Sequence, residues 1–337
     1  MGSVSGSGSI RAVRENLYFD DLIRRWDLDA VYRLMNCHLQ SDIPLMNEIF
    51  DHLLGTRGKG IRPLLVLICS AFGKRRKCGA AKLAAGLELL HMATLVHDDI
   101  IDGAAIRRNR LTINAKWGLS PAVLTGDFLY GKSLELVQAF GHEAVGRLSW
   151  IIEELVTGEF LQAEGLFDAE LGLTGYVRRV RKKTAAFFSQ CCALGALAGG
   201  ADDHTVRLLE RFGRFLGTGF QIYDDILDWI VSEKKAGKPV THDLQQGVMT
   251  LPVLAAVRMS PRNNEIISLI NRRRFSRKEI EWMHSEIMSS GAMAFSQRAA
   301  AGYCGRAEKY LKAFAPCRPR EDLLMLVKIL MSSVEDC

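Results

Sequence analysis

Prolines and long apolar runs are both scarce in this sequence. Only 8 of the 337 residues are proline, and several of these lie where neighbouring residues already indicate a loop. The longest apolar runs, such as Leu64 to Phe72, are much shorter than the roughly 20 residues that a membrane span needs. The N-terminal stretch "MGSVSGSGSIRAV" is too polar for a secretory signal peptide. We therefore expect a cytoplasmic protein without a transmembrane segment.

Cysteine pairs of the kind that bind zinc are also missing. The 8 cysteines form no CxxC pair, and most of them lie inside apolar segments, where reduced cysteines contribute to packing. The formal net charge is +6, which is consistent with an anionic partner. No recognised nucleic-acid-binding motif accompanies this charge, so we expect no nucleic-acid partner.

Strand-like alternation is rare as well, and a helical period dominates after about residue 20. We expect an all-α fold, with residues 1–20 as a flexible N-terminal arm or a segment left by expression. Residues 21–337 are then a single all-α domain. The clearest apolar repeats at intervals of three and four residues cover Leu83–Ile101, Trp150–Glu164, Tyr176–Ala198 and Thr205–Ile230.

Two acidic motifs follow apolar runs, "HDDIID" at residues 97–102 and "YDDILD" at residues 223–228. On a helix, Asp98 and Asp102 lie one turn apart on the same face, with Asp99 beside them. Like charges at this spacing repel, so a cation is needed to compensate them. Oxygen ligands favour a hard cation such as Mg²⁺, and the spacing of a Ca²⁺-binding EF-hand is absent. A solvated helix end is the alternative for one motif, but it is a weaker explanation for two. The second motif repeats the pattern with Asp224, Asp225 and Asp228.

Basic residues lie close to both acidic motifs in the sequence. Each is typical of a surface when taken singly, but together they indicate a cradle for a diphosphate, because arginine and lysine bind phosphate oxygens. His91 lies two helical turns before Asp98, so it is either a structural residue or a ligand of the same site. The basic candidates are Lys59 and Arg62 in "GKGIRP", Arg107 and Arg108 in "IRRNR", Lys182 and Lys183 with Thr184 in "RKKTA", and Lys238 in "KKAGKP".

Ordered blocks over nearly the whole chain resemble the trans-prenyl diphosphate synthases, which elongate isoprenoid chains head to tail. They include "ELLHMATLVHDDIID", "LTGDFLYG", "GEFLQAEG", "KKTAAFF", "GTGFQIYDDILD" and "GKPVTHDLQQG". The blocks "YVRRVRKKTA", "CALGALAGGAD" and "QQGVMTLPVL" are similar to those of the large catalytic subunits of two-component heptaprenyl diphosphate synthases.

This resemblance implies the isoprenoid synthase fold, a helical bundle around a central cavity with the two acidic motifs opposed across it. It also implies that about three Mg²⁺ ions bind with the diphosphate. By motif, the metal ligands and catalytic aspartates are Asp98, Asp99, Asp102, Asp224, Asp225 and Asp228. The isopentenyl diphosphate site is Lys59, Arg62, His91 and Arg108. The allylic diphosphate site is Arg107, Lys183, Thr184, Gln221 and Lys238, with Lys183 also counted as catalytic.

The reaction implied is ionisation of the allylic diphosphate, attack by the double bond of isopentenyl diphosphate, and loss of a proton. The growing chain should then run along the first acidic helix toward its N-terminus. Short-chain relatives place a bulky aromatic residue four or five positions before the motif, where this chain has Thr94 and Ala93. This small pair indicates a product of about C30 to C40, with C35 favoured.

Some positions depart from the family pattern. Asn109 and Leu111 replace the usual Gly and Pro, and Val248 stands where many members have a lysine. Thr241 and His242 also replace a Gly and a small or acidic residue.

Several alternatives remain open. The chain is either a homodimer or a heterodimer with a small second subunit. Other possibilities are a farnesyl or geranylgeranyl diphosphate synthase of the same family, or a non-catalytic subunit. Such subunits usually lose aspartates of the two acidic motifs, which this chain retains. A class I terpene cyclase is a further alternative, but its second metal motif normally differs from "DDILD".

Overall fold

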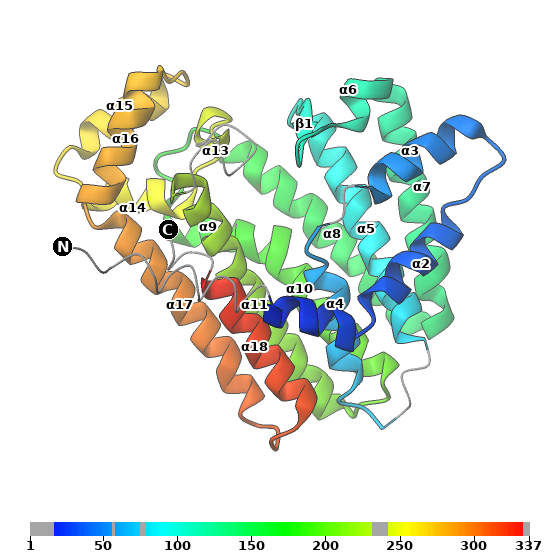
Figure 1. The fold of residues 1–337 in the computed structure, drawn as a ribbon. Helices are drawn as coiled ribbons and strands as arrows, with labels where there is room; N and C mark the ends of the chain where they lie inside the picture. Colours follow the sequence, from blue (N-terminus) through cyan, green and yellow to red (C-terminus); the bar gives the residue numbers. More distant parts are fainter. Residues whose placement is uncertain (1–16, 56–57, 75–78, 231–241, 333–337) are drawn as a thin grey trace, which may run out of the picture. The chain divides into compact units, whose positions relative to one another are not determined.

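The computed structural model describes residues 17–55, 58–74, 79–230 and 242–332 (Figure 1). Within these ranges nearly all regular elements are helices, which confirms the all-α prediction. Residues 17–25 are helical, so the last residues of the predicted N-terminal arm belong to a helix. Lys238 and Thr241 lie outside the described residues. No helix in the described part of the chain has both the length and the apolar character needed to cross a membrane.

The chain divides into two compact units, each assembled from separate segments of the sequence. The first contains Met1–Trp150, Gln190–Glu210 and Phe314–Met325. The second contains Ile151–Ser189, Arg211–Ala313 and Leu326–Cys337. The expected single domain over residues 21–337 stays a prediction. Four of the five boundaries between these segments fall within helices, and the fifth follows α17 (Ala292–Leu311). The four divided helices are α8 (His142–Glu164), α10 (Ala186–Ala198), α11 (Asp203–Ile230) and α18 (Arg318–Ser332).

Helix α5 (Ala80–Ile101) is the central element of the first unit. It is apolar on nearly all sides, as expected for a helix that neighbouring helices surround. Leu83, Leu87 and Leu90 are fully buried, and the helix packs against three neighbours in the unit (Figure 1). These neighbours are α2 (Leu28–His38), α4 (Ile61–Ser70) and α7 (Leu119–Val137). Helix α3 (Pro44–Leu54), α6 (Ile113–Trp117) and the 3₁₀ turn η1 (Gln138–Phe140) also lie within this unit.

A short hairpin follows α5, and the sequence did not predict it. Strands β1 (Ile106–Arg107) and β2 (Arg110–Leu111) pair in antiparallel register. The two turn residues between them, Arg108 and Asn109, have φ angles of 49° and 61°. Two successive positive φ values are what a tight two-residue hairpin requires, and asparagine tolerates them better than most residues.

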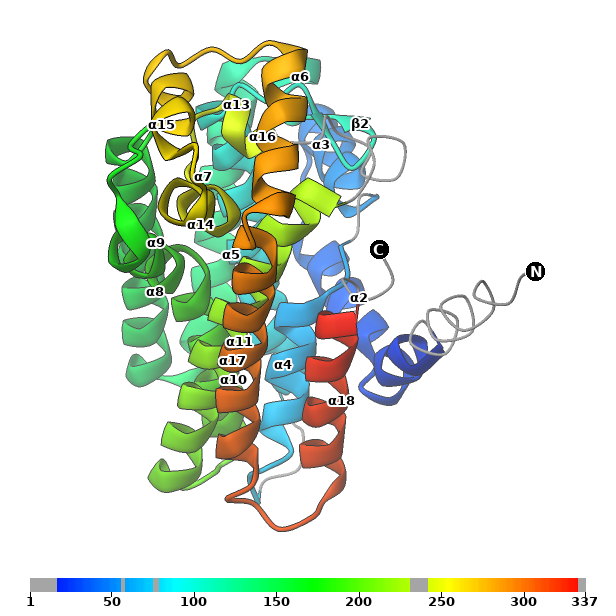
Figure 2. The same cartoon turned by 90° about the vertical axis from the view of Figure 1, so that its left-hand side faces the viewer.

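The second unit surrounds α14 (Leu251–Met259), a short helix with an almost completely buried sequence. It packs against α17 (Ala292–Leu311), α16 (Arg277–Ser289), α15 (Asn263–Asn271) and α9 (Gly172–Val180) (Figure 2). The stretch Tyr176–Ala198 is not one regular helix, because the π-helical turn η2 (Arg181–Ala185) separates α9 from α10. Helix α13 (His242–Gln245) is the remaining short element of this unit.

Candidate active site

The first acidic motif lies at the C-terminal end of α5. Asp98 is half-buried, Asp99 is buried and Asp102 is exposed. The backbone N–H of Asp102 donates to the carbonyl oxygen of Asp98 at 2.8 Å, and the helix ends there. Because the C-terminal end of a helix carries partial negative charge, the helix adds to the charge of the carboxylates. This end of α5 therefore attracts cations.

Asp99 is already held by a residue of the hairpin. The Nε of Arg107 donates to Asp99 Oδ1 at 2.7 Å. Burial raises the pKa of Asp99, and the charge and hydrogen bond of Arg107 oppose that rise. The hairpin thus brings a predicted diphosphate-binding arginine to the first acidic motif.

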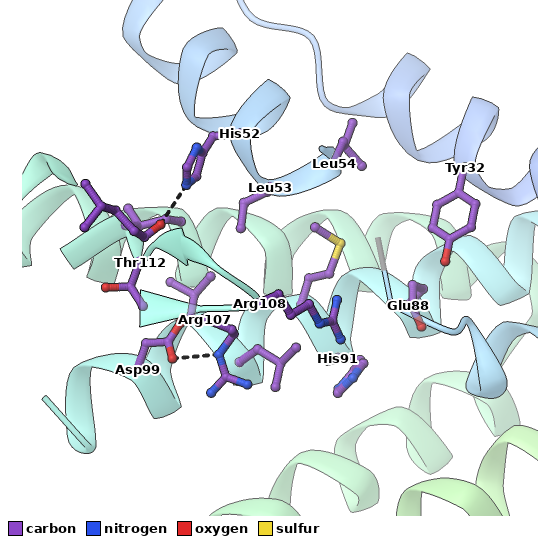
Figure 3. A pocket seen from close by; sticks show the side chains of 16 residues that line it. Tyr32, His52, Leu53, Leu54, Glu88, His91, Asp99, Arg107, Arg108 and Thr112 are labelled. Atoms are coloured by element: carbon purple, nitrogen blue, oxygen red, sulfur yellow. Dashed lines mark hydrogen bonds and ion pairs between the residues drawn. The ribbon is translucent and has the colours of Figure 1, made fainter. Parts of the chain in front are cut away.

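A pocket opens beside this motif in the first unit, and Figure 3 shows the side chains that line it. One part is polar and includes His91, Asp99, Arg107 and Arg108. The guanidinium group of Arg108 lies against the "GKGIRP" loop, since a Cβ added to Gly58 would be 2.6 Å from Arg108 Nη2. The other part of the lining is apolar, with Leu53, Leu54, Met92, Leu95, Val96, Leu111 and Ile113.

Arg62 and His91 are in contact at the N-terminal end of helix α4. The Nη1 of Arg62 donates to Nε2 of His91 at 3.1 Å, which requires this nitrogen to be unprotonated. Burial lowers the pKa of His91 well below its ordinary value, and the charges of Arg62 and Arg108 lower it further. His91 is thus a neutral imidazole that orients Arg62, which makes its direct role one of hydrogen bonding rather than of charge.

Glycine at position 60 lets the loop reach this position. Gly60 precedes α4 with φ of 64°, and a Cβ there would lie 2.7 Å from Leu28 Cδ2. Any other residue would be strained and would clash with α2. Lys59 is exposed in the same loop, whereas Arg62 is half-buried in the first turn of the helix.

The second acidic motif lies in the second unit, near the end of the described part of α11. Asp224 is exposed, Asp225 is buried and Asp228 is half-buried. The hydroxyl of Tyr176 donates to Asp225 Oδ2 at 2.6 Å, and Nε2 of Gln221 donates to Oδ1 at 3.0 Å. Burial is the main cause that raises the pKa of Asp225 to about 7, with the charge of Asp243 adding to the rise.

A hydrogen-bonded chain connects this motif to the π-helical turn. The Thr184 hydroxyl donates to Gln221 Oε1 at 2.7 Å, and Gln221 in turn donates to Asp225. Lys183, beside Thr184, forms an ion pair with Glu159 of α8 at 2.7 Å and donates to Gln162 Oε1 at 3.2 Å. The structure therefore brings Lys183, Thr184, Gln221 and Asp225 into one region of the second unit.

Gly158 of α8 makes room for the π-helical turn. A Cβ added at this position would lie 2.8 Å from the backbone nitrogen of Lys183. Single π-helical turns insert one extra residue into a helix and occur often at functional sites. Here the turn presents Lys183 to Glu159 and Gln162.

The block "GEFLQAEG" contributes to the family resemblance, but the sequence pattern gave no role to Glu159 and Gln162 within it, nor to Tyr176 or Glu88. The first two were detectable, because they lie three residues apart on one helix face. Tyr176 and Glu88 gave no such signal, since each lies in an ordinary helical pattern.

The remaining predicted residues are placed as follows. Ala93 is fully buried and Thr94 half-buried on α5, and neither lines the pocket of Figure 3. Val248 is buried. The two acidic motifs belong to different units, so their opposition across a cavity stays a prediction.

The aspartates fit a hard divalent cation by their chemistry. Asp99 and Asp225 are buried carboxyls with raised pKa values, so a bound cation would favour their charged forms. Among the described residues, no three His, Cys, Asp or Glu side chains form a complete metal-binding cluster by themselves. Carboxylate oxygens are ligands that Mg²⁺ accepts together with water molecules and substrate oxygens.

Comparison with known proteins identifies the family. The profile described as "Polyprenyl synthetase" matches residues 43–287. Heptaprenyl diphosphate synthase component 2 of Bacillus subtilis (strain 168) is 37% identical over 305 residues, which are 90% of this chain and 87% of that protein. The crystal structure of heptaprenyl diphosphate synthase from Staphylococcus aureus has a TM-score of 0.85 at 34% identity, covering 93% of this chain and 98% of the other.

A second crystal structure concerns the ligands of a relative. The polyprenyl synthase of Caulobacter crescentus CB15, complexed with calcium and isoprenyl diphosphate, has a TM-score of 0.88 at 31% identity. The similarity covers 93% of this chain and 97% of that one. That relative thus binds a divalent cation and a diphosphate. The chain described here belongs to the polyprenyl synthetase family of prenyltransferase enzymes.

Proposed function

We propose that the chain condenses isopentenyl diphosphate with an allylic prenyl diphosphate to give an all-trans polyprenyl diphosphate. The observation that carries this proposal is the pocket beside the first acidic motif. The pocket combines Arg107, Arg108 and the neutral His91 with an apolar wall, which suits a small hydrocarbon that carries a diphosphate.

Isopentenyl diphosphate is assigned to this pocket. Arg62, oriented by His91, and Arg108, placed against Gly58, supply the guanidinium groups for its diphosphate. Lys59 is exposed in the adjoining loop and adds a mobile point charge of the kind that lysine provides.

The allylic diphosphate is assigned to the acidic motifs, together with Arg107, Lys183, Thr184, Gln221 and Lys238. When bound, Mg²⁺ supplies positive charge that stabilises the departing diphosphate. Its proposed ligands are Asp98, Asp99, Asp102, Asp224, Asp225 and Asp228. Of these, Asp98, Asp102, Asp224 and Asp228 are not fully buried, whereas Asp99 and Asp225 are held by neighbouring donors.

Product length is proposed to be about C30 to C40, with C35 favoured. Ala93 and Thr94 are small side chains on α5, so they leave room for a tail that passes the acidic motif. The Bacillus subtilis relative is described as component 2 of a heptaprenyl diphosphate synthase, which supports both C35 and a second subunit as partner.

The direct test uses the purified chain with Mg²⁺, farnesyl diphosphate and labelled isopentenyl diphosphate, followed by sizing of the products. We expect products of about C35, and we expect EDTA to abolish them because the metal is needed for ionisation. Product that appears only after a small subunit is added would indicate a two-component enzyme. No product under either condition would contradict the proposal.

A further inference from the structure

Glu88 is a buried carboxyl group in the pocket that the proposed reaction does not use. It lies on α5 three residues before His91, and only 6% of its surface is exposed. It lines the same pocket as His91 and Arg108, and all three side chains are labelled in Figure 3. Its Oε2 atom accepts no hydrogen bond from any described residue. Such an atom needs a partner, because a buried polar group without one is costly.

The surroundings of Glu88 hold both acidic and basic groups. Burial raises its pKa, while the charges of Arg62 on α4 and Arg108 on the hairpin turn lower it. Besides these arginines, the titratable groups that line the pocket are His91 and Asp99 on α5, Arg107 on β1, Tyr32 on α2 and His52 on α3. The buried thiol of Cys191 on α10 also interacts with Glu88 electrostatically.

A bound diphosphate would change this balance in one direction. Its negative charge neutralises Arg62 and Arg108, which are the two groups that favour the charged form of Glu88. The diphosphate also repels a carboxylate directly. Both effects raise the affinity of Glu88 for a proton, so ligand binding and protonation favour each other.

We propose that Glu88 takes up a proton as isopentenyl diphosphate binds and donates a hydrogen bond from Oε2 to a diphosphate oxygen. The inference rests on the proposed function, because it uses the same pocket. The proton is transferred from hydronium or a buffer acid in the solvent, whose bond to that proton breaks as an O–H bond forms on Oε2, and no bond of the diphosphate breaks. Glu88 is thus a binding residue for the substrate in its neutral form, beside the arginines that bind it by charge.

A purely structural role for Glu88 leads to a different result. If the carboxylate only holds Arg62 and Arg108 apart from one another, it stays charged when the diphosphate binds. Binding would then take up no proton through Glu88. Replacing Glu88 would change the affinity by the same factor at every pH.

The test is isothermal titration calorimetry with isopentenyl diphosphate, with EDTA and no added metal, between pH 7 and 9. Each pH is measured in two buffers of different ionisation heat, which gives the number of protons taken up. For the wild type we expect net proton uptake on binding relative to Glu88→Gln. Its dissociation constant should also rise more steeply with pH than that of Glu88→Gln, by up to about a further tenfold per pH unit. Glu88→Gln keeps the shape and an N–H donor but does not titrate, so its binding should depend less on pH.

Glu48→Gln is the matched control, because it makes the same change at an exposed position of α3. It should behave like the wild type. Ionisation of the diphosphate itself is common to all three proteins, so it cancels in the comparison. Thermal melting of Glu88→Gln establishes that it is folded, so that its proton uptake can be subtracted from that of the wild type.

Equal proton uptake and equal pH dependence in the wild type and Glu88→Gln would overturn the inference. The proposed function has its own readout, since elongation of farnesyl diphosphate by labelled isopentenyl diphosphate does not depend on this result. A wild type that elongates but shows no Glu88-linked uptake refutes only the inference. A wild type that neither binds isopentenyl diphosphate nor elongates refutes both.

Discussion

Asp225 is fixed by two donors in a region that water scarcely reaches. Tyr176 and Gln221 occupy its two oxygens, and the neighbouring Asp243 adds negative charge. The two hydrogen bonds favour the carboxylate, but burial outweighs them, which is why the pKa rises to about 7. In the absence of a cation, this residue therefore makes the fold more stable when it is protonated.

The stability of the metal-free protein should depend on pH through Asp225. A pKa raised in the folded state stabilises the fold below about pH 4, and this contribution is lost as pH rises through about 7. Over that window the free energy of unfolding should fall by up to about 4 kcal/mol more in the wild type than in Asp225→Asn. Urea unfolding in EDTA measures it, with the exposed Asp224→Asn as control. Parallel pH profiles for wild type and Asp225→Asn would contradict the prediction.

Thr94 offers a test of product length at a position that is only half-buried. Its hydroxyl donates to the backbone oxygen of His91 at 2.7 Å, so the side chain is fixed on α5. We expect Thr94→Phe to shorten the main product, because a larger side chain obstructs the tail. Thr94→Val keeps the volume and removes only the hydroxyl, so it should leave the product unchanged. Ala93→Tyr should shorten the main product as well. Thin-layer chromatography of labelled products gives the product length for all three variants.

Unchanged products from both Thr94→Phe and Ala93→Tyr would remove these two residues from the explanation of chain length. A shorter product from Thr94→Val would show that the hydroxyl matters rather than the size.

At the scale of elements, the π-helical turn depends on a glycine in another helix. In Gly158→Ala the added methyl group would lie 2.8 Å from the backbone nitrogen of Lys183, so the turn must move away from α8. We expect a loss of roughly 1–3 kcal/mol in stability and a KM for the allylic substrate raised about tenfold, with the KM for isopentenyl diphosphate nearly unchanged.

Gly146→Ala provides the matched control on the same helix. Apart from its chain neighbours and the nearby backbone of its own helix, no atom of the described residues lies within 4 Å of a Cβ added there. Alanine is a better helix former than glycine, so this variant should gain about 0.5–1 kcal/mol of stability. Kinetics with each substrate varied in turn gives the KM for the allylic substrate and the KM for isopentenyl diphosphate separately. A Gly158→Ala enzyme with wild-type kinetics would show that the turn tolerates displacement.

The main helices could be predicted from the sequence, but their irregular parts could not. Repeated apolar residues from Leu83 to Ile101 were sufficient to locate α5, because burial of apolar faces determines most helices. A π-helical turn adds only one residue to the helical repeat, and the apolar pattern gave no signal of the turn before Ala186. The hairpin rests on positive φ angles at Arg108 and Asn109, which few sequence patterns specify.

The candidate site was predictable where one spacing determined the geometry. Asp98 and Asp102 lie one turn apart at the C-terminal end of α5, where Asp102 is the C-cap, as their spacing required. Partners that come from distant segments were not predictable, such as Tyr176 for Asp225, because a tertiary contact has no local sequence signature. The structure places His91 in contact with Arg62, which the sequence assigned to the same site, but the neutral state of His91 depends on burial and on Arg62, which only the fold provides.

At the scale of the whole molecule, the proposed mechanism requires both acidic motifs to act on one diphosphate. Each unit contributes three aspartates and at least one basic residue, and neither set contains a complete metal-binding cluster among the described residues. If both motifs hold ions on the same diphosphate, removal of one motif should leave the other with little contribution to diphosphate affinity. Motifs that bind metal separately would instead contribute additive free-energy changes to diphosphate binding.

A double-mutant cycle with Asp98→Asn and Asp224→Asn distinguishes these cases. The probe is binding of inorganic pyrophosphate at a fixed Mg²⁺ concentration, measured by calorimetry. We expect each single variant to lose about tenfold or more in affinity and the double variant to lose little beyond the weaker single one, because residues that act as a unit are not additive. Asp203→Asn, an exposed aspartate at the start of α11, is the control and should combine additively with Asp98→Asn. Full additivity of Asp98→Asn with Asp224→Asn would mean that the two motifs do not share a ligand, and the proposed mechanism would then fail.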